Sequence, residues 1–280
     1  MRWQYSSWPA KSINDSRQIL NKVPTLLAIA VLLPALSACA GRKDSAPSTP
    51  VAPGQIRVVI PKAEPRSASG NPPFYEVRGK RYHVLDDASG YRERGVASWY
   101  GKKFHGRQTA NGERYDMYAA SAAHKTLPLP AYARVTNLEN GRSVIVRIND
   151  RGPFVANRLI DLSYGAAVEL DMIRNGTSFV EVEVVGPRSQ RRKQGGRRPA
   201  MVPGTLYVQV GAFADRGNAT RLRSMLIDAD VKNVVIRKDR VNGRRIYRVR
   251  IGPVASVEEF DATVERVGEL GVSDAYLATE

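Results

Sequence analysis

Cysteine and histidine are scarce in this chain, and their scarcity narrows the chemistry open to it. Among 280 residues there are one cysteine and three histidines. A single cysteine excludes an intrachain disulfide and a zinc site built from several thiolates. Three histidines leave little for a histidine metal site, so we expect neither a metal nor a cofactor.

Acidic residues are also in short supply. Lys and Arg number 43 against 27 Asp and Glu, which gives a formal net charge of +16. Such a balance favours polyanionic partners, among them nucleic acid, anionic lipid and an acidic polymer of the cell envelope. The hydrophobic fraction of 42% is sufficient for a core, and the length fits one or two domains.

The N-terminus lacks a hydrophobic run long enough to cross a bilayer as a helix. Residues 23–38 are apolar but contain two prolines, and the stretch is shorter than the roughly 20 residues that a spanning helix needs. A basic segment followed by such a stretch is typical of a secretory signal. Because small residues precede Cys39, the end of the stretch resembles a bacterial lipobox. We predict a lipoprotein signal peptide over residues 1–38 and lipidation of Cys39. The alternative is a lone, inert, buried thiol.

The residue after the predicted lipidation site bears on the destination of the protein. Ala40 follows Cys39, which resembles the sorting pattern of lipoproteins delivered to the outer membrane. Each buried CH₂ of an acyl chain contributes about 0.8 kcal/mol, so several chains give a firm anchor. We therefore expect an outer-membrane lipid anchor that faces the periplasm, where nucleic acid is scarce.

Composition divides the remaining chain into four parts. Residues 39–94 comprise Cys39, a Pro- and Ser-rich stretch that predicts a flexible tether, and a mixed segment from residue 74. Residues 95–186 and 205–280 are compact blocks. Between them, residues 187–204 contain six basic residues and no acid, which predicts a disordered linker. This linker either contacts an anionic surface or is merely solvated.

Hydrophobic periodicity gives the two blocks different architectures. The C-terminal block predicts the order βαββαβ, with Asp215 and Ser256 capping its two helices and Asn242-Gly243 forming a hairpin turn. Its strands are predicted at residues 206–213, 231–237, 245–251 and 275–278. The middle block predicts a small barrel of short strands, with one helix near residues 164–170. The strands predicted there are residues 96–100, 131–137, 143–149 and 180–185.

Candidate catalytic groups lie at turns of the middle block. Glu113 follows a tight turn, and Asp150 ends an apolar strand just before Gly152. If both face one groove, they make a carboxylate pair suited to cleaving a glycosidic bond. Without function, Asp150 is an Asx-turn residue and Glu113 is a solvated loop acid. The nearby Trp99, Tyr100 and Phe104 form either a sugar-stacking platform or part of the core.

Five segments of the middle block, taken in order, resemble the rare lipoprotein A family, whose core is a double-psi β-barrel. They are GVASWYG (95–101), TANGERYD (109–116), AAHKTLPLP (122–130), RINDRGPF (147–154) and IDLS (160–163). The C-terminal block is similar to the SPOR domain that accompanies this barrel in many members. The resemblance implies a mixed fold: a six-stranded double-psi β-barrel followed by a small α+β SPOR domain of the ferredoxin-like type.

The resemblance also implies an activity. It points to an endolytic peptidoglycan lytic transglycosylase, which cuts the MurNAc–GlcNAc β-1,4 bond without water and leaves 1,6-anhydro-MurNAc ends. By similarity, cleavage depends on Glu113 and Asp150, with Asp116 and His124 in supporting roles. We favour Asp150 as the acid/base because it is held at a strand end. The alternative is a non-catalytic, expansin-like wall-binding lipoprotein.

For the SPOR-like block, the resemblance implies binding of glycan strands that lack stem peptides, the wall material at the division septum. The predicted binding face is the sheet, with Gln209, Phe213, Ile246 and Arg248 as contacts. Ala212 stands where many relatives carry Ser. Without the resemblance, these polar residues would be ordinary exposed strand positions. A nucleic-acid binder is disfavoured, because the block lacks the aromatic run that RNA-recognition modules use for stacking.

Overall fold

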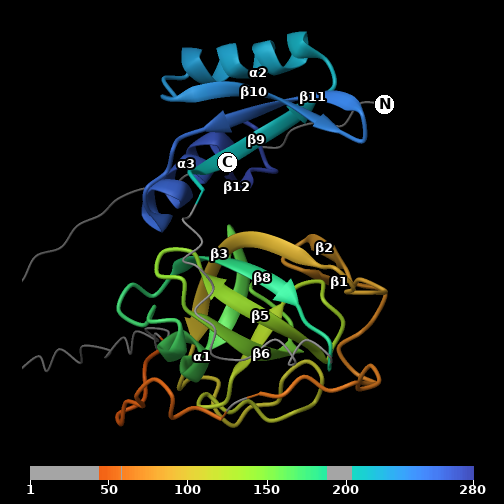
Figure 1. Cartoon of the computed structure of the whole chain (residues 1–280), viewed down its shortest axis with the longest axis vertical. Coiled ribbons are helices and arrows are strands. Elements are labelled where there is room, and N and C mark those ends of the chain that lie inside the picture. Colours follow the sequence, from red (N-terminus) through yellow and green to blue (C-terminus); the bar gives the residue numbers. More distant parts are fainter. Residues whose placement is uncertain (1–43, 58, 188–203) are drawn as a thin grey trace, which may run out of the picture. The chain divides into compact units, whose positions relative to one another are not determined.

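The computed structural model describes residues 44–57, 59–187 and 204–280 (Figure 1). The predicted signal peptide, Cys39 and most of the basic linker lie outside the described residues. Within the described ranges, no helix is both long and apolar enough to cross a membrane.

Six strands close into a barrel in the order β3-β7-β4-β6-β5-β8. This confirms the six-stranded barrel predicted for the middle block. Two of the strands, β4 and β7, were not among those predicted, and β4 is buried on both faces, so it shows no alternating pattern. The strands are β3 (Arg92–Tyr100), β4 (Ser121–His124), β5 (Ala131–Asn137), β6 (Ser143–Asp150), β7 (Arg158–Ser163) and β8 (Ser178–Val184).

Alternate strand residues fill the barrel interior, where Ala122, Ile148 and Leu162 are completely buried. The intervening residues face outward. Helix α1 (Tyr164–Glu169) confirms the helix predicted near residues 164–170, and Ser163 caps it by accepting a hydrogen bond from the Ala166 amide at 3.2 Å.

The segment before the barrel is held more firmly than its composition indicates. The Ser67 amide donates to the Leu129 carbonyl at 2.9 Å. The Asn71 side chain brackets the same residue, donating to its carbonyl at 2.7 Å and accepting from its amide at 2.8 Å. We call residues 59–73 the strap. The strap thus differs from the flexible tether predicted for this stretch, because one side-chain amide supplies both the donor and the acceptor that a barrel loop requires.

After the strap, β1 (Phe74–Val77) and β2 (Lys80–His83) form an antiparallel hairpin. No strand was predicted for these residues, which the sequence analysis describes only as a mixed segment. The hairpin is tied to the barrel, since the Tyr75 hydroxyl donates to the Lys125 carbonyl at 2.8 Å.

The C-terminal block has the predicted βαββαβ order, with a four-stranded antiparallel sheet in the order β10-β11-β9-β12. Asp215 and Ser256 cap its helices as expected. Asn242 and Gly243 have φ of 50° and 78°, as the hairpin turn between β10 and β11 requires. The elements are β9 (Leu206–Phe213), α2 (Arg216–Asp228), β10 (Val234–Val241), β11 (Arg244–Ile251), α3 (Val257–Glu269) and β12 (Tyr276–Thr279).

One strand of this block begins later than predicted. The prediction placed it at residues 231–237, whereas β10 runs from Val234 to Val241. The Val231 amide instead donates back to the Leu226 carbonyl at 2.9 Å, which ends α2. Asn233 then takes a left-handed conformation, with φ of 56°.

Candidate active site

The loop of residues 109–113 brings both predicted acids to one region of the barrel. The Ala110 amide donates to Oδ1 of Asp150 at 2.8 Å. One residue on, the Asn111 side chain donates to Oε1 of Glu113 at 2.9 Å. The loop is tied to the end of β6 by a backbone hydrogen bond of 3.3 Å from Asn111 to the carbonyl of Asn149. Glu113 and Asp150, remote in sequence, therefore meet at one short loop, which Glu113 ends and Asp150 contacts.

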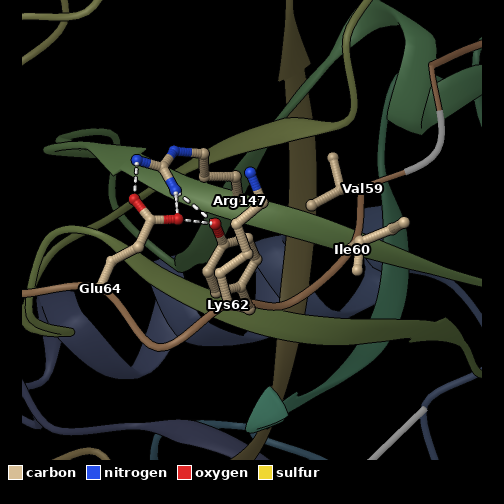
Figure 2. Close-up of a pocket in the computed structure, with 6 residues that line it drawn as sticks. Val59, Ile60, Lys62, Glu64 and Arg147 are labelled. Atoms are coloured by element: carbon tan, nitrogen blue, oxygen red, sulfur yellow. Dashed lines mark hydrogen bonds and ion pairs between the residues drawn. The ribbon is translucent and has the colours of Figure 1, made fainter.

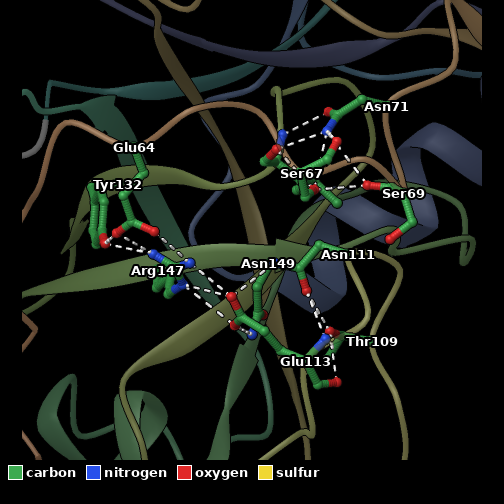
Figure 3. A network of polar contacts seen from close by, with 11 residues as sticks. Glu64, Ser67, Ser69, Asn71, Thr109, Asn111, Glu113, Tyr132, Arg147 and Asn149 are labelled. Atoms are coloured by element: carbon green, nitrogen blue, oxygen red, sulfur yellow. Dashed lines mark hydrogen bonds and ion pairs between the residues drawn. The ribbon is translucent and has the colours of Figure 1, made fainter.

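Glu113 is held as an ionised carboxylate (Figure 3). Arg147 donates from Nη2 to its Oε1 at 2.7 Å, and Asn149 donates to its Oε2 at 2.9 Å. Burial acts to raise the pKa of Glu113, but the hydrogen bonds from Arg147, Asn149 and Asn111 outweigh burial and hold the pKa below its ordinary value. Glu113 is therefore poorly suited to donate a proton.

Asp150 has the opposite electrostatic character. Its Oδ1 accepts from the amides of Ala110 and Arg151, each at 2.8 Å, whereas Oδ2 has no hydrogen-bond partner among the described residues. Burial raises the pKa of Asp150 above its ordinary value, although both amides act to lower it. A carboxyl with a raised pKa and a free oxygen is suited to acid/base work.

A second carboxyl, which sequence reasoning missed, lies close to Asp150. Ala123 of β4 pairs with Asp150 on β6 and with Asp161 on β7. Asp161 accepts a hydrogen bond from the Ser98 hydroxyl on β3. Its pKa is raised, by burial and by the negative charge of Asp150, although Ser98 acts against the shift. The signal in the sequence was an acid between two apolar strand residues, within the quoted segment IDLS.

The aromatic residues divide between the site and the core. The rings of Tyr100 and Tyr115 stack with centroids 4.2 Å apart and belong to the same cluster as Ala123. Phe104 lies at the edge of this pair, 6.0 Å from the Tyr100 ring, and is 40% exposed. Trp99 instead packs against Tyr164 at 5.8 Å. Tyr100 is therefore part of the core, at 9% exposed, and of the three predicted aromatic residues only Phe104 is open to a ligand.

His124 is a buried structural residue. Its Nδ1 accepts from the amides of Thr126 and Leu127, at 3.2 and 3.1 Å. The proton therefore sits on Nε2, which lies 3.0 Å from the Tyr91 hydroxyl. Burial lowers the pKa of His124 to about 3, with further lowering by Lys125 and by the guanidinium of residue 151. A neutral imidazole bound in this way orders the loop after β4 and does not transfer protons.

Asp116 serves a turn beside the site. Its carboxylate accepts from the Tyr118 amide at 3.0 Å and lies 4.0 Å from Nδ1 of His105. It has no recorded hydrogen bond to Glu113 or Asp150. In the described part of the chain, no three His, Cys, Asp or Glu side chains gather in a way that could hold a metal ion.

The outer face of the C-terminal sheet carries a second polar cluster. The Gln209 side chain accepts from Arg248 at 3.4 Å and from Arg250 at 3.3 Å, and it donates to the Tyr276 hydroxyl. Ile246 lies two residues before Arg248 on the same strand and so shares its face. Sequence reasoning singled out neither Arg250 nor Tyr276, although Tyr276 is 51% exposed.

Phe213 does not share that face, contrary to the prediction. It packs into the helix-covered core with Leu222 of α2 and pairs with Tyr247, which is also core-facing. The cause is a bulge, seen as a register shift between Val249 and Arg250, which reverses the alternation along β9. The sequence alternation alone placed Phe213 beside Gln209.

Comparisons with known proteins match both blocks. The family model described as "Lytic transglycolase" matches residues 92–182, and the SPOR domain model matches residues 202–278. The chain is 48% identical to the endolytic peptidoglycan transglycosylase RlpA of Vibrio cholerae, over 93% of this chain and 98% of that protein. It is 38% identical to the RlpA of Pseudomonas aeruginosa strain UCBPP-PA14, over 82% and 83%. The crystal structure of the RlpA SPOR domain from Pseudomonas aeruginosa covers 27% of this chain and 99% of that chain, with 31% identity and a TM-score of 0.26.

Proposed function

The chain belongs to the family of the endolytic peptidoglycan transglycosylase RlpA, and from this premise we propose how, on what and where it acts. Membership makes the chain a peptidoglycan transglycosylase with a double-psi β-barrel and a SPOR domain. The proposal is that it cleaves MurNAc–GlcNAc bonds in strands that lack stem peptides. The products carry 1,6-anhydro-MurNAc ends.

The observation that carries the proposal is the environment of Asp150. A general acid must be protonated before the reaction begins, and burial raises the pKa of this carboxyl in a site that also contains Asp161. Asp150 protonates the glycosidic oxygen as the bond to the muramyl anomeric carbon breaks. It then takes the proton of the muramyl 6-hydroxyl as that oxygen bonds to the same carbon. No water is consumed, so one acid/base carboxyl suffices.

Glu113 acts in this scheme as a fixed anion. Its contacts with Arg147 and Asn149 hold the loop of residues 109–113 against β6. The same loop supplies the Ala110 amide that orients Asp150. Glu113 therefore positions the acid, and its negative charge favours the positive charge that develops on the sugar.

The proposed location of the enzyme in the cell rests on Cys39 and on the SPOR domain, which lie at the two ends of the mature chain. Lipidation of Cys39 anchors the enzyme to the outer membrane, facing the periplasm. The SPOR domain binds stripped strands at the division septum through Arg248, Arg250 and Tyr276, which supply charge and a stacking ring on one face. Palmitate labelling of the wild type and of Cys39→Ser tests the anchor, and loss of label from the variant is expected.

Digestion of purified wall sacculi by the mature chain tests the activity. Mass spectrometry is expected to detect anhydro-muramyl fragments, in greater yield from sacculi stripped of stem peptides. If the chain pelleted with both kinds of sacculi and released nothing, an expansin-like binding role would replace the proposed one.

A further inference from the structure

An open pocket of about 430 Å³ lies between the strap and the barrel (Figure 2). Arg147 belongs to both the pocket and the candidate active site, because its guanidinium binds Glu113 and also lines the pocket. The strap half of the pocket lies outside residues 92–182, the part matched by the barrel family model. The lining residues are Val59, Ile60, Lys62, Glu64, Tyr132 and Arg147.

Most of the polar groups in the pocket are already paired with each other. Arg147 binds both carboxylate oxygens of Glu64, at 2.8 and 2.9 Å, and the Tyr132 hydroxyl donates to Glu64 as well. These contacts hold the pKa of Glu64 below its ordinary value. Glu64 and Arg147 therefore form a paired floor that fastens the strap to β6.

Lys62 is a cationic residue of the pocket that has no such pairing in the described part of the chain. It has no hydrogen bond or ion pair to any residue that the structure describes, yet its charge reaches far enough to help lower the pKa of Glu64. Val59 and Ile60 add an apolar wall, and Ile60 is 57% exposed. An exposed apolar wall beside an unpaired ammonium fits a small ligand that carries both a methyl group and a carboxylate.

We propose that this pocket is a subsite for the free lactyl group of muramic acid. The lactyl ether presents a methyl group, which fits against Ile60, and a carboxylate, which binds the Lys62 ammonium. This inference rests on the proposed function, because it assumes a glycan strand in the adjoining site. The shared Arg147 makes the subsite continuous with the candidate active site.

The lactyl carboxylate is free only where the stem peptide has been removed. With a peptide attached, that carbon is an amide, and the charge that would bind Lys62 is gone. Selection of stripped strands therefore takes place in the barrel itself, in addition to any selection by the SPOR domain.

Two changes, one in the enzyme and one in the substrate, test the subsite together. Lys62→Gln removes the ammonium and Lys62→Arg keeps a cation, while Lys232→Gln removes an exposed lysine charge in the other domain. Each full-length mature chain is assayed on stripped glycan strands and on the same strands with their lactyl carboxylates converted to methylamides. KM and kcat are obtained from the release of anhydro-muramyl ends.

The wild type and Lys232→Gln are expected to have a lower KM on the free carboxylate strands than on the methylamides. Lys62→Gln is expected to raise KM about 2- to 5-fold on the carboxylate strands only, with kcat unchanged, as for a partly exposed ion pair. Lys62→Arg should recover most of the difference.

Equal KM values for the wild type on both substrates, or an equal effect of Lys62→Gln on both, would overturn the subsite while leaving the activity in place. Failure of the wild type on both substrates would overturn the proposed function and the subsite with it.

Discussion

Asp150 and Asp161 flank the same residue, Ala123, from the strands on either side of β4. The two carboxyls lie 11 positions apart in sequence, and the order of the barrel strands brings them into one row. Burial raises the pKa of both, and the charge of Asp150 raises that of Asp161 further. In the proposed reaction Asp150 is the acid and Asp161 its neighbour, whereas Glu113 is held ionised by its hydrogen bonds from Arg147 and Asn149.

Replacing Asp161 with Asn is expected to lower the cleavage rate about 10-fold, the size expected when a neighbouring charge no longer raises the pKa of the acid by about one unit. The reason is that Asp161 adjoins the acid and shapes its electrostatic environment. Release of anhydro-muramyl products from stripped sacculi is the measurement. The matched control is Asp171→Asn, which alters an exposed acid paired only loosely with Arg142 at 3.5 Å. Comparable rates for the two variants would show that Asp161 has no part in catalysis.

Replacing Arg147 with Met is expected to destabilise the fold by about 1–3 kcal/mol, because the partly buried Glu113 and Glu64 lose charged hydrogen bonds. The free energy of unfolding is measured by urea denaturation. Arg142→Met, which removes an exposed arginine, should change that free energy by less than about 0.5 kcal/mol. A similar small change for both variants would mean that the strap and the loop are held by other contacts.

Because His124 is buried and neutral, the free energy of unfolding is expected to depend on pH. The pKa of His124 is about 3 in the folded chain, against an ordinary value of 6.5. Below the ordinary value the unfolded chain binds a proton that the folded chain does not, so stability falls as the pH drops from 6.5 towards 3. The fall is about 1.4 kcal/mol per pH unit for one such group. His124→Asn keeps an acceptor for the loop amides but cannot titrate, and its unfolding free energy should depend less steeply on pH over this window. Identical slopes for variant and wild type would exclude a buried neutral histidine.

Tyr276 and Phe213 lie on opposite faces of the C-terminal sheet, so replacing each of them is expected to have a different effect. Tyr276→Ala should weaken pelleting with stripped sacculi roughly 10-fold, a loss of about 1.4 kcal/mol, with little change in the melting temperature. Phe213→Ala should lower the melting temperature, because that ring packs in the core. Its effect on binding by the remaining folded protein should be small. The reverse pattern would restore Phe213 to the binding face and remove Tyr276 from it.

The sequence predicts the elements of the C-terminal block more completely than those of the barrel. In the C-terminal block, regular alternation, two helix caps and an Asn-Gly turn gave nearly every element, since these signals are local. In the barrel, β4 went unpredicted because its four residues are all buried and give no alternating pattern. The alternation in β7 is confined to Ile160, Asp161 and Leu162, a run too short to predict a strand. The bulge that turns Phe213 inward depends on the partner strand and leaves no mark in the pattern.

The same distinction applies to the candidate site. Turn chemistry and family resemblance singled out Glu113 and Asp150, and the structure brings both to one loop. Their electrostatic difference depends on Arg147, whose contact with Glu113 no local sequence pattern indicates. Asp161 becomes visible only when the strand order sets β7 beside β4. The order of the strap was not predicted, because the contacts that fasten it to the barrel are made with residues far along the chain.

The most direct test of the account compares Asp150→Asn with Glu113→Gln by mass spectrometry of sacculus digests, after both variants are shown to be folded. The account predicts that Asp150→Asn releases no anhydro-muramyl product, whereas Glu113→Gln, which alters only a positioning anion, retains measurable release. Anhydro-muramyl products from Asp150→Asn at the wild-type rate would contradict the assignment of Asp150 as the acid/base.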